Sequence, residues 1–585
     1  MIKFILKTVG LVVFITTLSL QIQAANIFVD WQATGANTGN DWSNAYTSLN
    51  TAITNANAGD LIYVAQGTYS TNNGFPFILK DGVRLYGGCA SAGIIPDPYR
   101  AILRNPSNYP TIISSGIGNT AIRINNNLGA GTRLDGFQIR GSSNNGIGIR
   151  IFSGTTINVA LTVNNCTFNG GGAYGVELFL SSILAHTITP HFINCTFTDL
   201  TAGVRFNIGG NIGNASNSIQ PKFTKCEFHD LTNSVQMEMS NGSLEPRFEF
   251  CRFYDNTGYV ITNPGDGVYI NNNNVCFCSN TYTYNPVFVN SLFYNNNGIA
   301  DLLVGVVNQG GDLSLDIINC TLWNNSIETS PSINVRSGSC YSMNNYQGRE
   351  NILKIQNSIL WNNDDVSGTW MSLSRGMEAD LEFSLVDATS CADGVNLIQT
   401  AALNCDPTNV IFNQSPQFVS TSTSTPNLRL TAFSPARNQG QNTFKPMDID
   451  TDLHGFARII ENTIDMGAYE YCPGGTPCYP KTTIDPSDPD PIGPTPTLSL
   501  RQTKQQVMDK HIQITTYPNP VKGTITVKTG HQIKVNTLQL MTIDGKVIKG
   551  NVRSHQLDVQ NVPKGLYLLK VQTDYGTQVL RVVKE

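Results

Sequence analysis

The sequence predicts an all-β protein whose core grows by repetition. The chain has 585 residues, too many for one ordinary globular core unless that core extends in one dimension. Charged residues make up only 14% while glycine is abundant, a composition that suits many strands joined by tight turns. A short phrase, with a small residue two positions before an apolar one, recurs along the chain, as in HFINCTFTDL at 191–200. Together these observations favour a β-solenoid.

The N-terminus has the pattern of a signal peptide. Residues 1–24, MIKFILKTVGLVVFITTLSLQIQA, combine a short basic start, an apolar run and a small-residue end at Ala24 or Ala25. The run is short and nothing similar follows it, so we expect no transmembrane segment after removal of the signal. The alternative is a buried N-terminal strand or helix. Export would place the chain where disulfides are permitted.

The net charge of the chain constrains its partners only weakly. It is −5 at pH 7, which is small for this length. No general attraction to nucleic acid or to an anionic membrane surface follows, and we expect neither as a partner.

Copies of the repeated phrase share one register. Each has a Cys or Ser, an apolar residue two positions later and another three positions earlier. The Cys/Ser positions are Cys166, Cys195, Cys226, Cys251, Ser291, Cys320, Ser358 and Ser384. The later apolar residues are Phe168, Phe197, Phe228, Phe253, Phe293, Leu322, Leu360 and Val386. Successive Cys/Ser positions are 25 to 40 residues apart, so a basic unit of under thirty residues accommodates insertions, as the coil of a solenoid does.

The phrase predicts an inward-facing column of small residues. Positions two apart lie on the same face of a strand, whereas the offset of three on the other side requires a bend. Asn165, Asn194, Asn290, Asn319 and Asn357 precede the Cys/Ser, and Asn tolerates the left-handed backbone of such a bend. Its side chain is expected to bond locally or to the Asn of the next coil. The Cys/Ser and the following apolar residue would stack coil upon coil, about 4.8 Å apart.

The cysteines of this column are predicted to be core filler with free thiols. Free Cys behaves as a small buried hydrophobe, and its exchange with Ser argues against a required thiol. The strand spacing also exceeds the Cβ separation that a disulfide prefers. Cys391 with Cys405, and Cys472 with Cys478, are close in sequence and are expected as local disulfides. The Cys-Phe-Cys stretch at 276–278 favours a disulfide or free thiols over zinc, because no His neighbours it.

Two further sets of phrases indicate the kind of solenoid. The first set is DWSNAYTSLNTAI at 41–53, GDLIYVAQGTY at 59–69, GVRLYGG at 82–88 and LDGFQIRG at 134–141. The second is SPARNQG at 434–440 and DMGAYE at 465–470, with Asp452, Gly455 and Arg458 between them. Residues 25–471 thereby resemble a right-handed parallel β-helix of the pectin-lyase-like kind, closed by a segment similar to that of the choice-of-anchor Q domain. His454 stands where that closing pattern usually has an acidic residue.

Residues 472–515 have the composition of an extended linker. The stretch DPSDPDPIGPTPT at 485–497 is rich in Pro, which blocks both helix and ladder hydrogen bonds. Its clustered Asp residues are expected to be solvated rather than to bind calcium.

Residues 516–585 predict a separate small β-sandwich. Apolar residues alternate with period two around an Asp-Gly turn, and ten Lys/Arg against four Asp/Glu give this part +6, which leaves −11 for the remainder. The ordered motif residues are Tyr517, Pro518, Asn519, Pro520, Gly523, Asp544, Gly545, Pro563, Gly565 and Tyr567. They resemble the type A C-terminal sorting domain of type IX secretion. The resemblance implies handling by the type IX machinery, removal of the domain after export, and attachment to lipopolysaccharide on the outer surface of a Gram-negative bacterium.

No catalytic constellation is recognisable in the sequence. A hydrolase needs paired carboxylates, and a lyase needs a base with a cation or an Arg/Lys near the substrate carboxylate. The adjacent pair Asp364-Asp365 is expected in a turn. His186, His191 and His229 recur around successive coils, but scattered histidines are more often surface or core-edge residues than catalytic ones.

A cofactor is not predicted, with calcium as the weaker alternative. Asp448, Asp450 and Asp452 alternate like cation ligands, but the loop glycine comes too late for EF-hand spacing.

The sequence favours an exported, surface-attached protein of adhesin-like or glycan-binding type. Trp323, Trp361 and Trp370 could stack on sugars, although the first two could instead pack against the coils. The alternatives are a polysaccharide lyase or glycoside hydrolase acting on an extracellular polysaccharide, and a passive structural surface protein.

Overall fold

The computed structural model describes residues 24–473 and 515–585, with internal gaps. The gaps are residues 72–74, 92–99, 102, 117–119, 143–145, 182–183, 210–216, 240–241, 258–260, 263–281, 297–302, 308–311, 326–332, 338–350, 364–366, 375, 518, 529–534, 543–545, 553–554 and 574–575. The predicted signal peptide, except Ala24, and most of the predicted linker lie outside the described residues. The chain divides into two compact units, residues 1–485 and 486–585.

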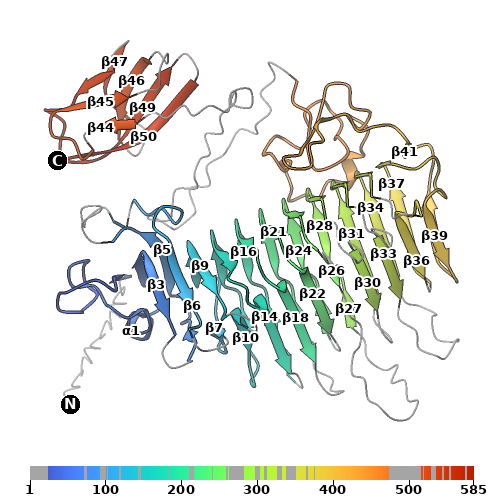
Figure 1. The fold of residues 1–585 in the computed structure, drawn as a ribbon, viewed down its shortest axis with the longest axis horizontal. Helices are drawn as coiled ribbons and strands as arrows, with labels where there is room; N and C mark the ends of the chain where they lie inside the picture. The colour runs from blue at the N-terminus through green and yellow to red at the C-terminus, as the bar shows by residue number, and fades with distance from the viewer. Residues whose placement is uncertain are drawn as a thin grey trace, which may run out of the picture. The chain divides into compact units, whose positions relative to one another are not determined.

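The first unit is a parallel β-helix, which confirms the predicted fold class (Figure 1). Strands from successive coils pair in parallel to form three long sheets. The first sheet contains β1 (Asn26–Val29), β2 (Leu61–Ala65), β5 (Arg84–Cys89), β8 (Arg133–Asp135), β11 (Asn158–Val159), β12 (Thr162–Asn164), β15 (Thr187–Ile188), β16 (His191–Ile193), β19 (Ser218–Ile219), β20 (Lys222–Thr224), β23 (Gly242–Leu244), β24 (Arg247–Glu249), β27 (Tyr282–Tyr284), β28 (Val287–Val289), β31 (Asp312–Ile318), β34 (Asn351–Gln356), β37 (Glu378–Glu382) and β40 (Ala402–Cys405).

The second and third sheets complete each coil. The second contains β3 (Gly67–Ser70), β6 (Thr111–Ser114), β9 (Phe137–Arg140), β13 (Thr167–Asn169), β17 (Thr196–Phe197), β21 (Glu227–His229), β25 (Arg252–Tyr254), β29 (Leu292–Tyr294), β32 (Thr321–Trp323), β35 (Ile359–Trp361), β38 (Leu385–Val386) and β41 (Ile411–Phe412). The third contains β4 (Phe77–Ile78), β7 (Thr120–Ile124), β10 (Ile147–Phe152), β14 (Tyr174–Ser181), β18 (Ala202–Gly209), β22 (Asn233–Met239), β26 (Ile261–Thr262), β30 (Leu303–Val307), β33 (Ile333–Ser337), β36 (Met371–Ser374) and β39 (Val395–Ile398).

Two columns of stacked phenylalanine rings fill the core of the middle coils. In the first sheet Phe192, Phe223, Phe248 and Phe288 stack at centroid distances of 4.8–4.9 Å. In the second sheet Phe168, Phe197, Phe228, Phe253 and Phe293 stack at 4.6–5.0 Å. Rings of one column meet rings of the other edge-on, the arrangement that the ring quadrupoles favour. These rings are at most 2% exposed, so the columns are a continuous apolar core.

The bend between the first and second sheets is made by the residue before each Cys/Ser. Asn165, Asn194, Asn290, Asn319 and Asn357 have φ between 48° and 53°, in the left-handed region. Lys225, Phe250 and Phe383 take the same conformation in the coils that lack Asn. The Asn194 amide also donates to Asn165 Oδ1 at 3.4 Å, a link from one coil to the next.

A buried asparagine ladder, which was not predicted from the sequence, marks the turn that follows the second sheet. The amides of Asn256, Asn296 and Asn325 each donate to the side-chain oxygen of the next member, ending at Asn363, over 2.8–2.9 Å. Each also donates to a backbone carbonyl of the coil before it. All four stand five positions after the Cys/Ser of the phrase, which is the signal that could have revealed them.

The N-terminal end of the β-helix is closed by the short α-helix α1 (Leu49–Asn55). Ser48 caps it by accepting a hydrogen bond from the Thr51 backbone, and Leu49, Ala52 and Ile53 bury its inner face. Nearby, Arg100 forms a buried ion pair with Asp30 and lies 3.9 Å over the ring of Trp42.

Residues 416–471, here named the closing segment, return over the outside of the second sheet. The segment contains the antiparallel pair β42 (Phe418–Ser420) and β43 (Asn427–Leu430) and a 3₁₀ turn at Asn442–Phe444. In Figure 1 it is the brown chain that lies beside the last coils. Leu428, Tyr469 and Ala468 bury Leu292 and Trp323, which point outward from β29 and β32. The closing segment is therefore a second layer over the C-terminal part of this sheet.

The second unit is an antiparallel β-sandwich. One sheet contains β44 (Thr515–Tyr517), β45 (Thr524–Lys528) and β48 (Gln556–Asp558); the other contains β46 (Val535–Met541), β47 (Val547–Val552), β49 (Gly565–Thr573) and β50 (Gly576–Lys584). Its own core is built from the alternating apolar residues, among them Ile525, Leu538, Leu540, Leu569 and Val571.

Candidate functional site

The residues of the Cys/Ser column are buried in the core of the β-helix. All eight are at most 1% exposed, and the five cysteines are free. The Cys195 thiol contacts the carbonyls of Val163 and Ile193 at 3.5 and 3.4 Å, and the Ser358 hydroxyl donates to the equivalent carbonyls of Ile317 and Gln356. Burial raises the pKa of the Cys195 thiol well above its ordinary value and that of Cys320 to about 12. Protonated, buried thiols of this kind are poor nucleophiles.

The cysteines outside the column differ in their state. Cys391 and Cys405 form a disulfide that joins the loop before β39 to the end of β40. Cys472 is disulfide-bonded as well, and Cys478, its predicted partner, lies outside the described residues. The stretch 276–278 also lies outside them.

The three histidines do not form one site. His186 is 1% exposed, and its Nδ1 accepts from the Ile157 backbone. His191 lies on the outer side of β16, with Nε2 2.9 Å from Thr224 Oγ1. Burial lowers the pKa of both rings. His229 lies on β21, in the second sheet, whereas His186 and His191 belong to the first sheet or directly precede it. The three histidines that recur along the sequence therefore do not lie on one face of the coils.

The alternating aspartates of the closing segment point to different partners. Asp448 pairs with Arg247 at 3.1 Å and Asp450 with Lys445 at 3.5 Å, whereas Asp452 is buried. Within the parts of the chain that the structure describes, no group of three or more His, Cys, Asp or Glu side chains is arranged to hold a metal ion.

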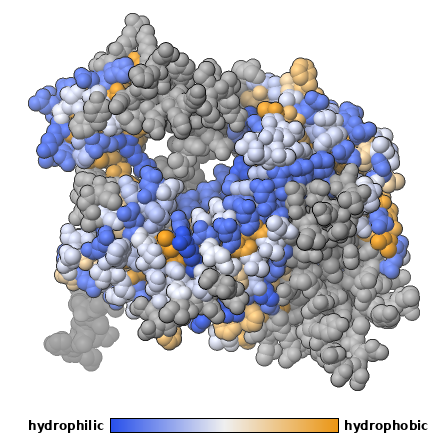
Figure 2. Space-filling view, in the orientation of Figure 1, coloured by the Kyte–Doolittle hydropathy of each residue, from blue (hydrophilic) through white to orange (hydrophobic). Residues whose placement is uncertain are grey.

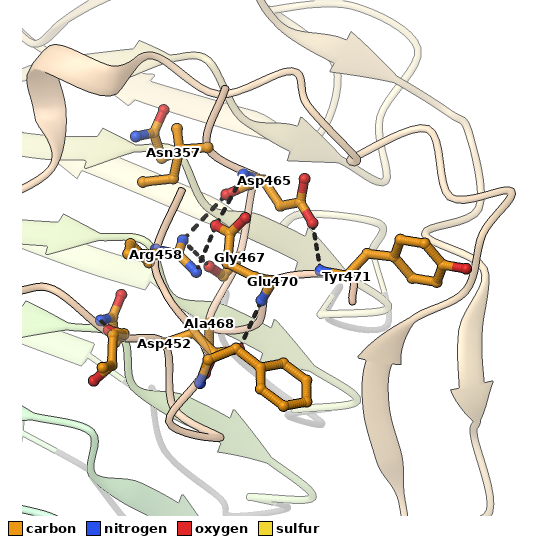
Figure 3. Close-up of polar contacts among 12 residues, drawn as sticks. Asn357, Asp452, Arg458, Asp465, Gly467, Ala468, Glu470 and Tyr471 are labelled. Atoms are coloured by element: carbon orange, nitrogen blue, oxygen red, sulfur yellow. Dashed lines mark hydrogen bonds and ion pairs between the residues drawn. The ribbon is translucent and has the colours of Figure 1, made fainter. Parts of the chain in front are cut away.

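A buried polar cluster holds the closing segment together (Figure 3). Arg458, Asp452, Asp465 and Glu470 are each at most 2% exposed. Arg458 donates to the carbonyls of Asp465 and Gly467 at 3.1 and 2.6 Å and lies 3.2 Å from the Glu470 carboxylate. Backbone N–H groups satisfy the carboxylates, including those of Phe456 on Asp452, Tyr471 on Asp465 and Asp465 on Glu470.

The electrostatics of this cluster indicate a structural role rather than a catalytic one. Burial raises the pKa of Asp452 and of Asp465 to about 6 and that of Glu470 well above its usual range, while Arg458 acts in the opposite direction on all three. The carboxylates face backbone donors inside the segment rather than solvent. His454, which departs from the resembled pattern, donates its backbone N–H to Asp452, and its ring packs edge-on against Phe456.

The tryptophans do not form the sugar-stacking platform that the sequence suggested. Trp323 is 5% exposed because the closing segment covers it, and Trp370 is 4% exposed within the coil core. Trp361 is half-buried beneath the same segment. The segment that covers Trp323 and Trp361 is far from them in sequence, whereas Trp370 is enclosed by the coils themselves.

An exposed acidic row follows the second sheet. Asp199, Asp230 and Asp255 occupy the same turn position in three successive coils, each with φ of 53–54°. His229 Nδ1 lies 2.7 Å from the Asp230 carboxylate. Partial burial and the neighbouring Asp230 raise the pKa of Asp255. Each aspartate stands four positions after the Cys of the phrase, a regularity that the sequence analysis passed over.

The sorting motif supports the fold of the second unit. Asn519 donates to the Arg581 carbonyl and accepts from the Val583 backbone at 2.8 Å, and the Tyr567 hydroxyl donates to the Pro563 carbonyl at 2.9 Å. Gly523 directly precedes β45, and Gly565 is the first residue of β49. Pro518, Asp544 and Gly545 lie outside the described residues, as does the side chain of Tyr517.

Comparison with known families identifies the second unit. Residues 515–585 match the family described as the secretion system C-terminal sorting domain. Residues 32–235 match the family described as a protein of unknown function (DUF1565). The C-terminal unit is thus a sorting domain of type IX secretion, and the protein is a secreted cargo of that system. Among the described residues, no helix is long and apolar enough to cross a membrane.

Solved structures similar to the chain include, by their titles, a pectate lyase and a bacteriophage tailspike protein. Pectate lyase Pel9A is 15% identical, with a TM-score of 0.43 over 77% of this chain and 97% of the lyase. Tailspike protein gp49 of Acinetobacter baumannii bacteriophage Fri1, a capsular polysaccharide depolymerase, is 9% identical, with a TM-score of 0.31 over 96% of this chain and 80% of the tailspike. No curated protein sequence gave a significant match.

Proposed function

We propose that this protein is a β-helix of the outer surface of a Gram-negative bacterium, with a glycan-binding, adhesin-like role. Its sorting domain delivers it outside the cell. After export the β-helix is the part that meets the surroundings, and attachment to surface lipopolysaccharide would keep it there.

The observation that carries this proposal is the regular array of polar side chains on the outside of the coils. In the first sheet Thr162, His191, Lys222 and Arg247 are in register; in the second Thr167, Thr196, Glu227 and Arg252 are in register. Figure 2 shows hydrophobic residues as small patches among hydrophilic ones on the face that it draws. Groups that repeat at the strand spacing of about 4.8 Å suit a ligand that is itself a repeating polymer, because many weak contacts then add.

A glycan array probed with the secreted chain tests this proposal. Saturable binding to one or a few glycan classes is the expected result. Binding to none of them, in a folded preparation, would contradict the glycan-binding role and leave the passive structural function.

A second candidate, a polysaccharide lyase or glycoside hydrolase, rests on the acidic row with His229. Glycoside cleavage uses two carboxyl groups, one of them with a raised pKa, and the pKa of the Asp255 carboxyl is raised by partial burial and by its neighbour Asp230. Turnover of a uronate polymer that is lost in Asp230→Asn but kept in Asp199→Asn would favour it, since the Asp230 carboxylate contacts His229 and, among the described contacts, that of Asp199 does not. The second variant is a matched control from the same row.

A further inference from the structure

The outer face of the third sheet carries a row of arginines across β7, β10, β14 and β18. Arg123, Arg150, Glu177 and Arg205 are in register from strand to strand. Their neighbours Ile149 and Ile151 point into the core. The guanidinium groups therefore follow one another along the axis of the β-helix, at a strand spacing of about 4.8 Å.

The row has more positive than negative charge. The Glu177 carboxylate lies 2.8 Å from Arg150 and 3.6 Å from Arg205, with only 4% of its side chain exposed. Arg123 has no ion pair or hydrogen bond to the part of the chain that the structure describes, although its Nε is shielded from solvent. Among the described side chains of this row, three guanidinium groups thus accompany one carboxylate. The row continues with neutral Gln236 in the next coil.

Aromatic rings flank these arginines on the same outer face. Phe152 is 36% exposed and stacks on Phe179 with centroids 5.9 Å apart. The Arg150 guanidinium lies 4.8 Å from the Phe179 ring centre and 5.4 Å from that of Phe152. Arg205 lies 5.0 Å over the ring of Tyr174 and donates to its hydroxyl at 2.8 Å. Stacking on rings orders a guanidinium and leaves in-plane N–H groups to donate.

We propose that this strip, made of Arg123, Arg150, Arg205, Phe152 and Phe179, binds an anionic, carboxylate-bearing polysaccharide. The inference rests on the proposed glycan-binding function and assigns it a face and a ligand class. Guanidinium groups bind carboxylates in bidentate fashion, and exposed aromatic rings pack on the apolar faces of sugars. The strip runs across the strands, so a linear polymer laid along the axis meets an arginine or a ring in each coil.

The test measures the affinity of the full secreted chain for alginate, with dextran as the neutral polymer. The double variant is Arg123→Gln/Phe152→Ser. Arg123 belongs to no ion pair among the described residues and Phe152 is the most exposed ring of the strip, so the variant should keep its fold, which a melting curve checks. We expect alginate binding that weakens with salt, a loss of about tenfold or more in the variant, and little binding of dextran.

Arg140→Gln is the matched control. Arg140 lies in the same coil as Arg150, points outward from the second sheet, and donates to Asn169 and Gln138 rather than to a carboxylate. It should leave the affinity unchanged. Equal losses in the control and the double variant, or stronger binding to double-stranded DNA than to alginate, would overturn the inference. If the wild-type protein binds glycans and the double variant binds them equally well, the assignment of the strip is wrong but the proposed function stands. If the wild-type protein binds no glycan, both are wrong.

Discussion

Replacing Arg458 by Met should release the closing segment from the second sheet. The change removes the guanidinium that faces Glu470 and the carbonyls of Asp465 and Gly467, in a site 1% exposed. Removing one partner from a buried charge pair costs about 3–5 kcal/mol. The lower end applies here, because the raised pKa of Glu470 lets that carboxyl take up a proton. A loss of about 3 kcal/mol raises the open population on the order of a hundredfold.

Amide hydrogen exchange measures this opening directly. Exchange over residues 452–470 should accelerate on the order of a hundredfold, while amides of the phenylalanine-filled coils keep their protection, because those coils have their own core. Emission from Trp323 should shift to the red in proportion to the population of the open state, and Trp323→Phe identifies that signal.

Arg437→Met is the control for this experiment. It removes the same charge from the same segment, but its pair with Glu461 is 25% and 33% exposed, so about 1 kcal/mol or less is expected. Equal acceleration of exchange in the two variants, or loss of protection throughout the coils, would contradict the prediction. It would show that the buried cluster does not hold the closing segment in place as a layer that opens separately.

Three further predictions follow from the buried groups and the sorting domain. Burial raises the pKa of Asp452 and Asp465 from 3.8 to about 6. The stability that the two protonated carboxyl groups contribute is therefore complete below about pH 4 and is lost as the pH rises through about 6. Amide hydrogen exchange over residues 452–470, corrected for its intrinsic rate, should be faster at pH 7.5 than at pH 5. Cys195→Ser should lower the melting temperature only slightly, because Ser358 makes the same contacts, whereas Cys195→Arg buries an unpaired charge and should cost several kcal/mol; comparable melting of the two would count against the role of the column. Deleting residues 516–585 should leave a folded protein in the periplasm, and cell fractionation that finds the deletion variant on the surface would contradict the sorting assignment.

The parts of the fold that the sequence revealed are those set by neighbours in the chain. A Cys/Ser two positions before Phe and one position after a left-handed Asn describes a strand, a bend and an inward face within six residues, so it can be read without knowing the pairing. The Asn256 ladder and the Asp199 row lie at fixed offsets in the same phrase and were equally accessible. The cover over Trp323 was not, because it depends on a chain segment far away in sequence.

The arginine strip illustrates a different obstacle to prediction. Glu177 stands eleven residues after Cys166, whereas Arg205 stands ten residues after Cys195, because the turn between the second and third sheets varies by one residue. A shift of one residue inverts which face a strand position occupies, so the phrase fixes no register for the third sheet. Only the observed pairing of β10, β14 and β18 places these side chains in one row.

The charge balance of the chain makes that strip a demanding test of local recognition. The sorting domain carries +6 and residues 1–515 carry −11, so the β-helix as a whole repels an acidic polymer, and a chain without residues 516–585 would repel it more strongly. Binding of alginate by a chain without residues 516–585 could therefore not be a general consequence of net charge. It would require a site whose local excess of guanidinium groups outweighs the field of the surrounding carboxylates, at distances within the Debye length of about 8 Å at physiological salt. Because Arg140 shares that field but lies on the neighbouring sheet, its substitution changes the net charge by the same amount as Arg123→Gln, and the difference between these variants reports the strip alone.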